Sequence, residues 1–222
     1  MVIYHTLEAK NLVIFDLPAV VSYDHLLLRK ALVAVFRASM PCPLVVRDID
    51  WSENARGVLN QVYQRSCNRL PEPEEVERIR KDFHKELKEY FLLNDDAFDV
   101  WSGVQNIFET LDRREDWDYV IVSDFWREST EFILSSCGIF SRKKYLLTPD
   151  DGISTAEIIK NFGNLHQLQG DEVLYLMARG IDEVESPPSV SRMERIRPPH
   201  RKKADMLEYP HFNKLFTSAR LV

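Results

Sequence analysis

The chain has 222 residues, of which 45% are hydrophobic and 29% charged, and its formal net charge is −6. These values are typical of a globular protein with a sizeable core, and the negative charge argues against general nucleic-acid binding. Because no apolar run is long enough to cross a membrane and the first residues lack a signal-peptide pattern, we expect a cytoplasmic protein with no membrane partner.

One strand and then a helical block are expected in the first part of the chain. The apolar run at 11–16 is bounded by polar residues and predicts a buried strand that ends on Asp16. Ser22 and Ser52 stand where the N-caps of two helices are expected. The helices predicted in this block span about 23–38, 52–68 and 71–92.

Strands and helices alternate from about residue 100 onward. The predicted helices span 102–113, 129–138 and 154–162. The predicted strands span 118–124, 143–148 and 172–178. Such alternation implies right-handed crossovers and a parallel sheet with helices on both faces. We therefore predict an α/β core formed by 1–20 and 100–185 and interrupted by an all-helical insertion at 21–99.

Residues 186–222 differ in composition from the rest of the chain. The stretch 186–203 is rich in proline, arginine and lysine, so we predict a basic arm that forms a loop or is partly ordered. Since the rest of the chain is acidic, the arm is expected to be solvated or to dock on an acidic protein surface. A short helix at 208–216 is predicted to pack back on the body.

Cysteine and histidine residues show no pattern of a site. Cys42, Cys67 and Cys137 are widely spaced and odd in number, so we expect reduced, buried thiols. The six histidines have no metal-ligand spacing, and no glycine-rich phosphate-binding motif occurs. Chemistry is therefore expected elsewhere, at the carboxyl ends of the parallel strands, where open sheets bind ligands.

Three motifs in order along the chain resemble those of the haloacid dehalogenase-like superfamily, specifically phosphatase-type members with a helical cap after the first strand. They are IFDLPAVV around Asp16, VIVSD with Ser123 and Asp124, and LYLMARGID with Asp182. The resemblance covers residues 11 to about 185. It implies a Rossmannoid α/β core with a parallel sheet and an inserted helical cap. It also implies a chemistry in which an aspartate attacks a phosphoryl group beside Mg²⁺.

The resemblance gives each candidate site residue a role. Asp16 takes the place of the nucleophile, Ser123 that of the group holding a phosphoryl oxygen, and Lys160 stands in for a phosphate-binding lysine. Asp16, Asp182 and Asp124 would bind Mg²⁺. The alternative for each residue is structural: Asp16, Ser123 and Asp182 as caps of turns, and Lys160 as a surface lysine.

Three positions depart from the pattern of that superfamily. Pro18 stands where an acid–base carboxylate is expected, Thr155 where the lysine is expected, and Ala178 where a metal-binding aspartate is expected. Proline cannot transfer a proton, and Mg²⁺ requires a near-octahedral shell of oxygens, so any magnesium site here is expected to be weak.

We therefore predict a catalytically degenerate pseudophosphatase that binds a protein partner or a small phosphorylated ligand. The alternative is an active phosphohydrolase that uses Asp16 as nucleophile on a small phosphorylated substrate. A dehalogenase ranks third, because Met177 and Ala178 offer none of the polar groups that such an enzyme uses in its last motif.

Overall fold

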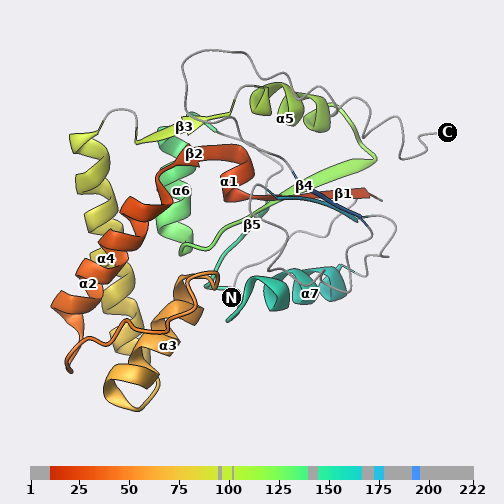
Figure 1. Ribbon diagram of the computed structural model, residues 1–222. Helices are drawn as coiled ribbons and strands as arrows, with labels where there is room; N and C mark the ends of the chain where they lie inside the picture. Colours follow the sequence, from red (N-terminus) through yellow and green to blue (C-terminus); the bar gives the residue numbers. More distant parts are fainter. Residues whose placement is uncertain are drawn as a thin grey trace.

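The computed structural model describes residues 11–94, 97–101, 103–139, 145–166, 173–177 and 192–195. Within these ranges a five-stranded sheet lies at the centre, with helices on both of its faces (Figure 1). The strands are β1 (Asn11–Asp16), β4 (Trp117–Val122), β5 (Tyr145–Leu147), β6 (Val173–Met177) and β7 (Arg192–Arg195). Their spatial order is β5-β4-β1-β6-β7, and every pairing is parallel, so the predicted parallel α/β sheet is confirmed.

The middle strand, β1, shows why a short apolar run becomes the centre of this sheet. It pairs with β4 on one side and β6 on the other, and Leu12 to Phe15 are buried. Val13 and Phe15 enter the larger hydrophobic cluster on one face, while Leu12 and Ile14 enter a smaller cluster on the other. A strand buried on both faces needs an unbroken apolar sequence, which is what 12–15 provides.

The helices among the described residues cover these two faces. Their bounds are α1 (Leu17–Val20), α2 (His25–Ser39), α3 (Ala55–Cys67), α4 (Pro73–Leu93), α5 (Val104–Asp112), α6 (Arg127–Ser136) and α7 (Thr155–Leu165). Helix α7 supplies the smaller cluster, and α2 to α6 contribute to the larger one. Pro73 begins α4, the Ser154 side chain caps the start of α7, and Gly138 adopts a left-handed conformation after α6.

Helices α2, α3 and α4 form a three-helix segment between two short strands, β2 (Val21–Tyr23) and β3 (Phe98–Val100). The two strands pair antiparallel where the chain leaves the sheet region and returns to it. Ser22 lies in β2, opposite Asp99, so its predicted role as a helix N-cap is wrong. The neighbouring Val21 and Tyr23 favour a strand, and α2 begins later, at His25.

Helix α3 also begins later than predicted. Its N-cap is Asn54, whose Oδ1 accepts hydrogen bonds from the backbone N–H groups of Arg56 and Gly57. Ser52, the predicted cap, instead donates from its hydroxyl and its backbone N–H to Asp50 Oδ1. The local turn therefore uses the serine, and the asparagine is left to start the helix.

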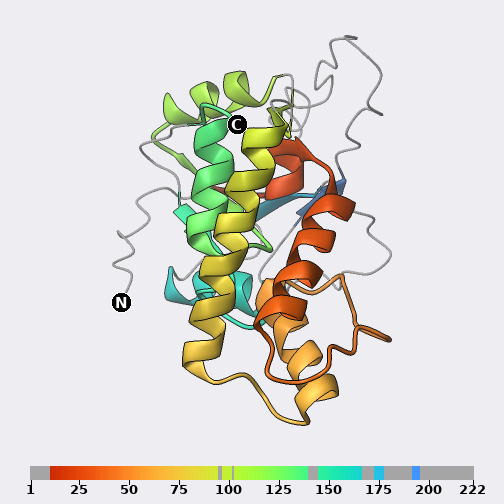
Figure 2. The ribbon, with the colours of Figure 1, turned by 90° about the vertical axis from the view of Figure 1, so that its left-hand side faces the viewer.

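Aromatic side chains join the three-helix segment to the rest of the molecule along α4 and α6, which lie side by side (Figure 2). We call this contact the α4–α6 seam. Phe83 stacks on Phe125 with ring centroids 5.7 Å apart and meets Trp126 edge-on at 5.9 Å. Phe91 meets Phe132 edge-on at 5.4 Å. The segment therefore shares one continuous core with the face of the sheet.

Cys42 and Cys67 are joined by a disulfide, with their Cα atoms 5.8 Å apart. The prediction of reduced thiols is therefore wrong for this pair. The disulfide can form because the α2–α3 loop runs back along α3 and brings two cysteines that are distant in sequence together. Cys137 is free and half-buried, as predicted for a reduced thiol, and burial raises its pKa to about 12.

The basic arm contains one element of structure that its composition did not predict. Arg192–Arg195 form β7, which pairs with β6 at the border of the sheet, so of the two alternatives predicted for 186–203, a loop or a partly ordered arm, these four residues agree with the second. Backbone pairing with β6 outweighs the nearby prolines, which lie outside the four paired residues. The predicted helix at 208–216 lies outside the described residues. In the described part of the chain, no helix combines the length and apolarity that crossing a bilayer requires.

Candidate functional site

The carboxyl ends of β1, β4 and β5 bring predicted site residues together. Asp16 ends β1 in register with Val122 of β4, so Ser123 follows immediately beside it. Thr148 follows β5 in the same way, and the backbone N–H of Ser123 donates to Leu147 O at 2.9 Å. We call Asp16, Ser123, Asp124 and Thr148 the strand-end edge. Asp16, Ser123 and Thr148 are all buried, with Asp16 7% exposed.

Asp16 performs a structural task at this edge. Its Oδ1 accepts a hydrogen bond from the backbone N–H of Ala19 at 2.9 Å, which makes Asp16 the N-cap of the single-turn helix α1. Capping of this kind satisfies a backbone donor that the helix itself cannot pair. The capping role weighed for Asp16 in the sequence is thus present in the structure.

Position 18 has no carboxylate, and the carbonyl oxygen of Pro18 already accepts a hydrogen bond. The indole N–H of Trp101 donates to Pro18 O at 2.8 Å. The backbone N–H of Trp101 donates to Val20 O at 3.2 Å. Trp101 follows β3, so these two hydrogen bonds attach the returning chain to the backbone of α1.

The Ser123 hydroxyl holds the turn between β4 and α6. It accepts a hydrogen bond from the backbone N–H of Phe125 at 3.1 Å and lies 2.8 Å from Thr130 Oγ1. Ser123 is 1% exposed and Thr130 is fully buried. Buried polar atoms are costly unless they are paired, so these contacts stabilise the turn, and they direct the hydroxyl toward α6.

Asp124 connects the strand-end edge to the three-helix segment. Its carbonyl oxygen accepts a hydrogen bond from the backbone N–H of Ala55, the first residue of α3, at 2.7 Å. Its carboxylate lies 3.4 Å from the hydroxyl of Thr155, the residue that stands in the predicted place of a lysine. The amino-terminal end of α3 therefore rests directly on the edge.

Negative charge gathers where α3 meets the edge. Burial, followed by the charges of Asp50 and Asp124, raises the pKa of Glu53. Gly57 packs so closely that a Cβ there would lie 3.0 Å from the Glu53 side chain and 3.4 Å from the Ile153 carbonyl oxygen. Burial is the largest cause of the shift in the pKa of Glu53, and the two neighbouring carboxylates oppose its ionisation further.

The arginines near the end of β5 are engaged with nearby carboxylates and carbonyls. Arg127 donates to Asp151 and to Leu146 O, and Arg80 of α4 pairs with Asp150 at 3.2 Å. Arg56 lies 3.5 Å from the carbonyl oxygen of Pro149. These cations bind the loop after β5 to α4 and α6, and their charge is offset by Asp150 and Asp151.

Two further predicted site residues lie apart from this group or outside it. Lys160 is exposed in the middle of α7, on the side opposite the buried Ile158, Ile159 and Phe162. Asp182, like Ala178, lies outside the described residues, so its predicted metal role stays a prediction. Of the predicted site residues, the structure brings together Asp16, Ser123 and Asp124.

Asn54 is a polar residue near the edge that the sequence analysis did not select. It is fully buried, and its Nδ2 has no hydrogen-bond partner among the described residues. Its Oδ1 caps α3, as described above. The signal was present, since Asn is among the strongest N-cap residues, but Ser52 competes for the same role two positions earlier.

The described residues do not fit a magnesium site at the strand-end edge. None of the groups of His, Cys, Asp or Glu in this part of the chain has three members placed to hold a metal ion. Asp16 Oδ1 and Pro18 O each already accept an N–H donor, and the predicted ligand Asp182 lies outside the described residues.

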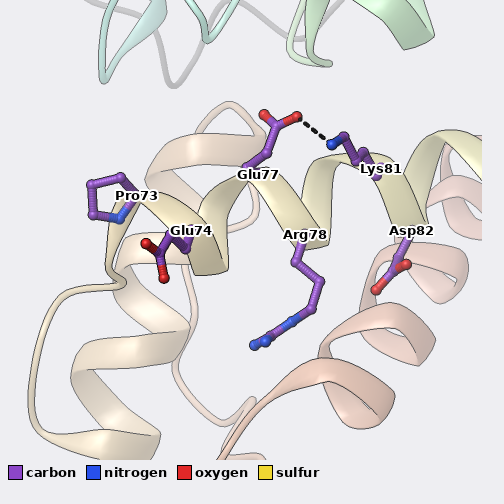
Figure 3. Close-up of a pocket in the computed structure, with 6 residues that line it drawn as sticks. All are labelled: Pro73, Glu74, Glu77, Arg78, Lys81 and Asp82. Atoms are coloured by element: carbon purple, nitrogen blue, oxygen red, sulfur yellow. Dashed lines mark ion pairs between the residues drawn. The ribbon is translucent and has the colours of Figure 1, made fainter.

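A surface depression of about 470 Å³ lies away from this edge, along α4 (Figure 3). Its lining residues are Pro73, Glu74, Glu77, Arg78, Lys81 and Asp82. Lys81 pairs with Glu77, while Arg78 and Asp82 point toward α2 and bond to the backbone and hydroxyl of Ser39. Its charged groups thus mainly join α4 to α2.

Comparison with known proteins identifies the fold. No protein-family model and no curated protein sequence matches the chain. A hydrolase from Pseudomonas syringae matches with a TM-score of 0.54 and 16% identity over 75% of both chains. CbbY from Rhodobacter sphaeroides matches with a TM-score of 0.53 in complex with phosphate, and 0.55 as a mutant in complex with xylulose-(1,5)bisphosphate. Both CbbY structures are 10% identical to this chain and cover 83% of it and 93% of their own length.

These structures share the fold and little of the sequence. Together with the strand order and the position of the three-helix segment, they show that this chain has the haloacid dehalogenase-like hydrolase fold that its motif order predicted. Identities this low carry the fold alone, so activity must be argued from the residues at the strand-end edge.

Proposed function

We propose that this chain is a catalytically degenerate protein with the haloacid dehalogenase-like fold, a pseudophosphatase with a binding or scaffolding role. Its core is formed by 1–20 and 100–185, its cap by 21–99, and its basic arm by 186–222. Of the two partners expected from the sequence, we favour a protein over a small phosphorylated ligand, because the polar groups at the strand-end edge are engaged by the chain itself.

One observation supports this proposal above the others. The groups that would attack, position or bind at a phosphoryl site are engaged by the chain itself. Ala19 N donates to Asp16, Trp101 Nε1 donates to Pro18 O, and Phe125 N donates to Ser123. A catalytic site needs donors and acceptors aimed at the reacting group, whereas these hydrogen bonds stabilise turns.

The test is hydrolysis of a generic aryl phosphate with Mg²⁺ by the wild-type protein and by Asp16→Asn. Asparagine preserves the size and capping ability of the side chain but cannot attack phosphorus, so it is a matched control. We expect both proteins to release phosphate at the rate of the buffer. Turnover by the wild type that Asp16→Asn abolishes would overturn the proposal.

An active phosphohydrolase is the second candidate, and the adjacency of Asp16 and Ser123 at parallel strand ends favours it. CbbY, which shares the fold, has been crystallised with phosphate. In this alternative Asp16 attacks, Ser123 and Lys160 hold the phosphoryl group, and Asp16, Asp124 and Asp182 bind Mg²⁺. Lys160→Ala and Asp182→Asn would then each lower the turnover found in the assay above, and neither would matter if the protein is a pseudophosphatase.

A further inference from the structure

The α2–α3 loop, residues 40–54, is attached to α3 at several points along its length (Figure 1). The loop runs antiparallel to the helix, so its start meets the end of α3 and its end caps the start of α3. Two hydrogen bonds lie between these ends, from Val45 N to Ser66 Oγ at 2.8 Å and from Asp50 N to Gln61 Oε1 at 2.9 Å.

The Cys42–Cys67 disulfide is the covalent member of this series and closes the far end of the loop. Its Cα–Cα distance of 5.8 Å is within the range that disulfides adopt without backbone movement. Both cysteines are half-buried rather than enclosed, so a thiolate in solution can reach the sulfur atoms. Besides the disulfide, the loop is held along α3 by the two hydrogen bonds at Val45 and Asp50.

The third cysteine does not compete for this exchange. Cys137 follows α6, and burial followed by the charge of Asp99 raises the pKa of its thiol, which keeps it protonated and a poor nucleophile. The sequence contains three cysteines in all, so Cys42 and Cys67 have each other as their reactive partner.

We propose that Cys42 and Cys67 form a reversible redox site that a dithiol reduces, and that this site sets how firmly the α2–α3 loop is held along α3. A thiolate of the dithiol attacks one sulfur and displaces the other cysteine as a thiolate, which takes up a proton. The second thiol of the reductant then attacks the mixed disulfide. Both cysteines end as thiols, and the reductant ends as a disulfide, so two electrons and two protons are transferred.

The α2–α3 loop lies between the disulfide at one end and the strand-end edge at the other. It ends at Asn54, and the N–H of the next residue, Ala55, donates to the carbonyl of Asp124. Releasing Cys42 from Cys67 frees the far end of the loop, and the hydrogen bonds at Val45 and Asp50 then hold it alone. The inference concerns regulation and stands whether or not the protein hydrolyses phosphate.

The experiment measures trypsin cleavage after Arg47, whose side chain is 89% exposed in the middle of the loop. A protease requires a locally unfolded segment, so the cleavage rate reports how often the loop opens. Air-oxidised protein is digested before and after incubation with dithiothreitol without denaturant. The digests are quenched and reduced before analysis, because the disulfide otherwise keeps the two fragments joined.

We expect reduction to accelerate this cleavage by at least about tenfold, since a cross-link of this loop length restricts opening strongly. Cys137→Ser, the matched control, behaves like the wild type. The double variant Cys42→Ser/Cys67→Ser is cut at the fast rate with or without dithiothreitol. Reoxidation of the wild type by glutathione disulfide restores the slow rate, which decides the matter even if the double variant folds poorly.

Thiol labelling after denaturation provides the chemical readout. Unreduced protein takes one label and protein reduced under native conditions takes three, the number of cysteines in the sequence. Three labels without reduction, one label after native reduction, or an unchanged cleavage rate after the disulfide opens would each overturn the proposal.

Discussion

Two of the contacts between the three-helix segment and the rest of the molecule have opposite character. At the α4–α6 seam, rings pack on rings: Phe83 lies between Phe125 and Trp126. At the strand-end edge, the contacts are single hydrogen bonds, such as the one from Ala55 N to Asp124 O. Apolar burial supplies most of the stability of a contact, and hydrogen bonds supply its geometry.

This difference bears on how the protein works. A lid that opens and closes needs an interface that it can leave at low cost. The seam is part of the continuous core, so the three-helix segment is fixed by aromatic packing while the edge beneath it is closed by polar contacts. A fixed segment over an edge whose acceptors are engaged fits a binding surface better than a substrate-admitting cleft.

The largest expected effect is at the seam. Phe83 is fully buried, so Phe83→Ala removes a ring from a packed site and should lower the free energy of unfolding by about 3 to 5 kcal/mol. Urea unfolding measures it. Leu92→Ala, at a side chain of the same helix that is 77% exposed, is the matched control and should cost less than about 0.5 kcal/mol. Similar losses in the two variants would contradict the importance of the seam.

The next effect is at the edge. Ser123→Ala leaves the N–H of Phe125 without its acceptor in a buried turn, so we expect a loss of about 1 to 3 kcal/mol in the free energy of unfolding. Ser136→Ala, where the hydroxyl bonds only to the carbonyl of Phe132 one helical turn earlier, should be nearly neutral. If Ser123→Ala leaves the free energy of unfolding unchanged, the hydroxyl is not structural, and its predicted role in holding a phosphoryl oxygen would be favoured.

Asp16 distinguishes a cap from a nucleophile by stability alone. Asp16→Ala removes the acceptor for Ala19 N and should lower the free energy of unfolding by about 1 kcal/mol, while Asp16→Asn keeps that acceptor and should be nearly silent. Thermal unfolding of the two variants gives the comparison. If both changes stabilise the protein, Asp16 would be a functional carboxylate and not a cap, because functional groups are often kept at a cost to stability.

The smallest effect is a pH dependence at the seam. Burial lowers the pKa of His84; Glu128, 3.3 Å from its Nε2, opposes this shift, and Lys88 adds to it. Because the folded pKa lies below the unfolded one, the unfolded chain binds more protons as the pH falls through about 6.5. Stability is therefore lost in that window and retained above it.

His84→Gln removes this titration and is the control for the pH dependence. We expect the difference in free energy of unfolding between the wild type and the variant to shrink from about pH 7.5 to about pH 5.5. His166, whose pKa burial also lowers, is present in both proteins and cancels in the difference. A difference that grows as the pH falls would mean that the ion pair with Glu128 outweighs burial.

The sequence predicted the features that depend on local pattern. The unbroken apolar runs of β1 and β4 predicted buried parallel strands. Because the carboxyl ends of parallel strands lie at one edge of the sheet, Asp16 and Ser123 were expected close together. The helix predicted over 71–92 is α4, where Pro73 and two glutamates stand in the first turn, as is typical of a helix start.

The features that the sequence did not predict depend on contacts between distant segments. Ser52 and Asn54 are both residues that can cap a helix. In the structure Asn54 is the cap, and the next residue, Ala55, bonds to Asp124, which is far along the chain. The disulfide needs the α2–α3 loop to run back along α3 before its two cysteines meet. The engagement of Pro18 by Trp101 likewise follows from the β2–β3 pairing.

The most direct test of the account is a thermal shift with Mg²⁺ and a phosphate mimic such as beryllium fluoride. Ligands that bind the folded state raise Tm by an amount that grows with the logarithm of the ligand concentration divided by Kd. If the acceptors at the strand-end edge are engaged by the chain itself, Tm should be the same with and without these additions, in the wild type and in Asp16→Asn alike. A rise of several degrees in the wild type that Asp16→Asn abolishes would contradict the account.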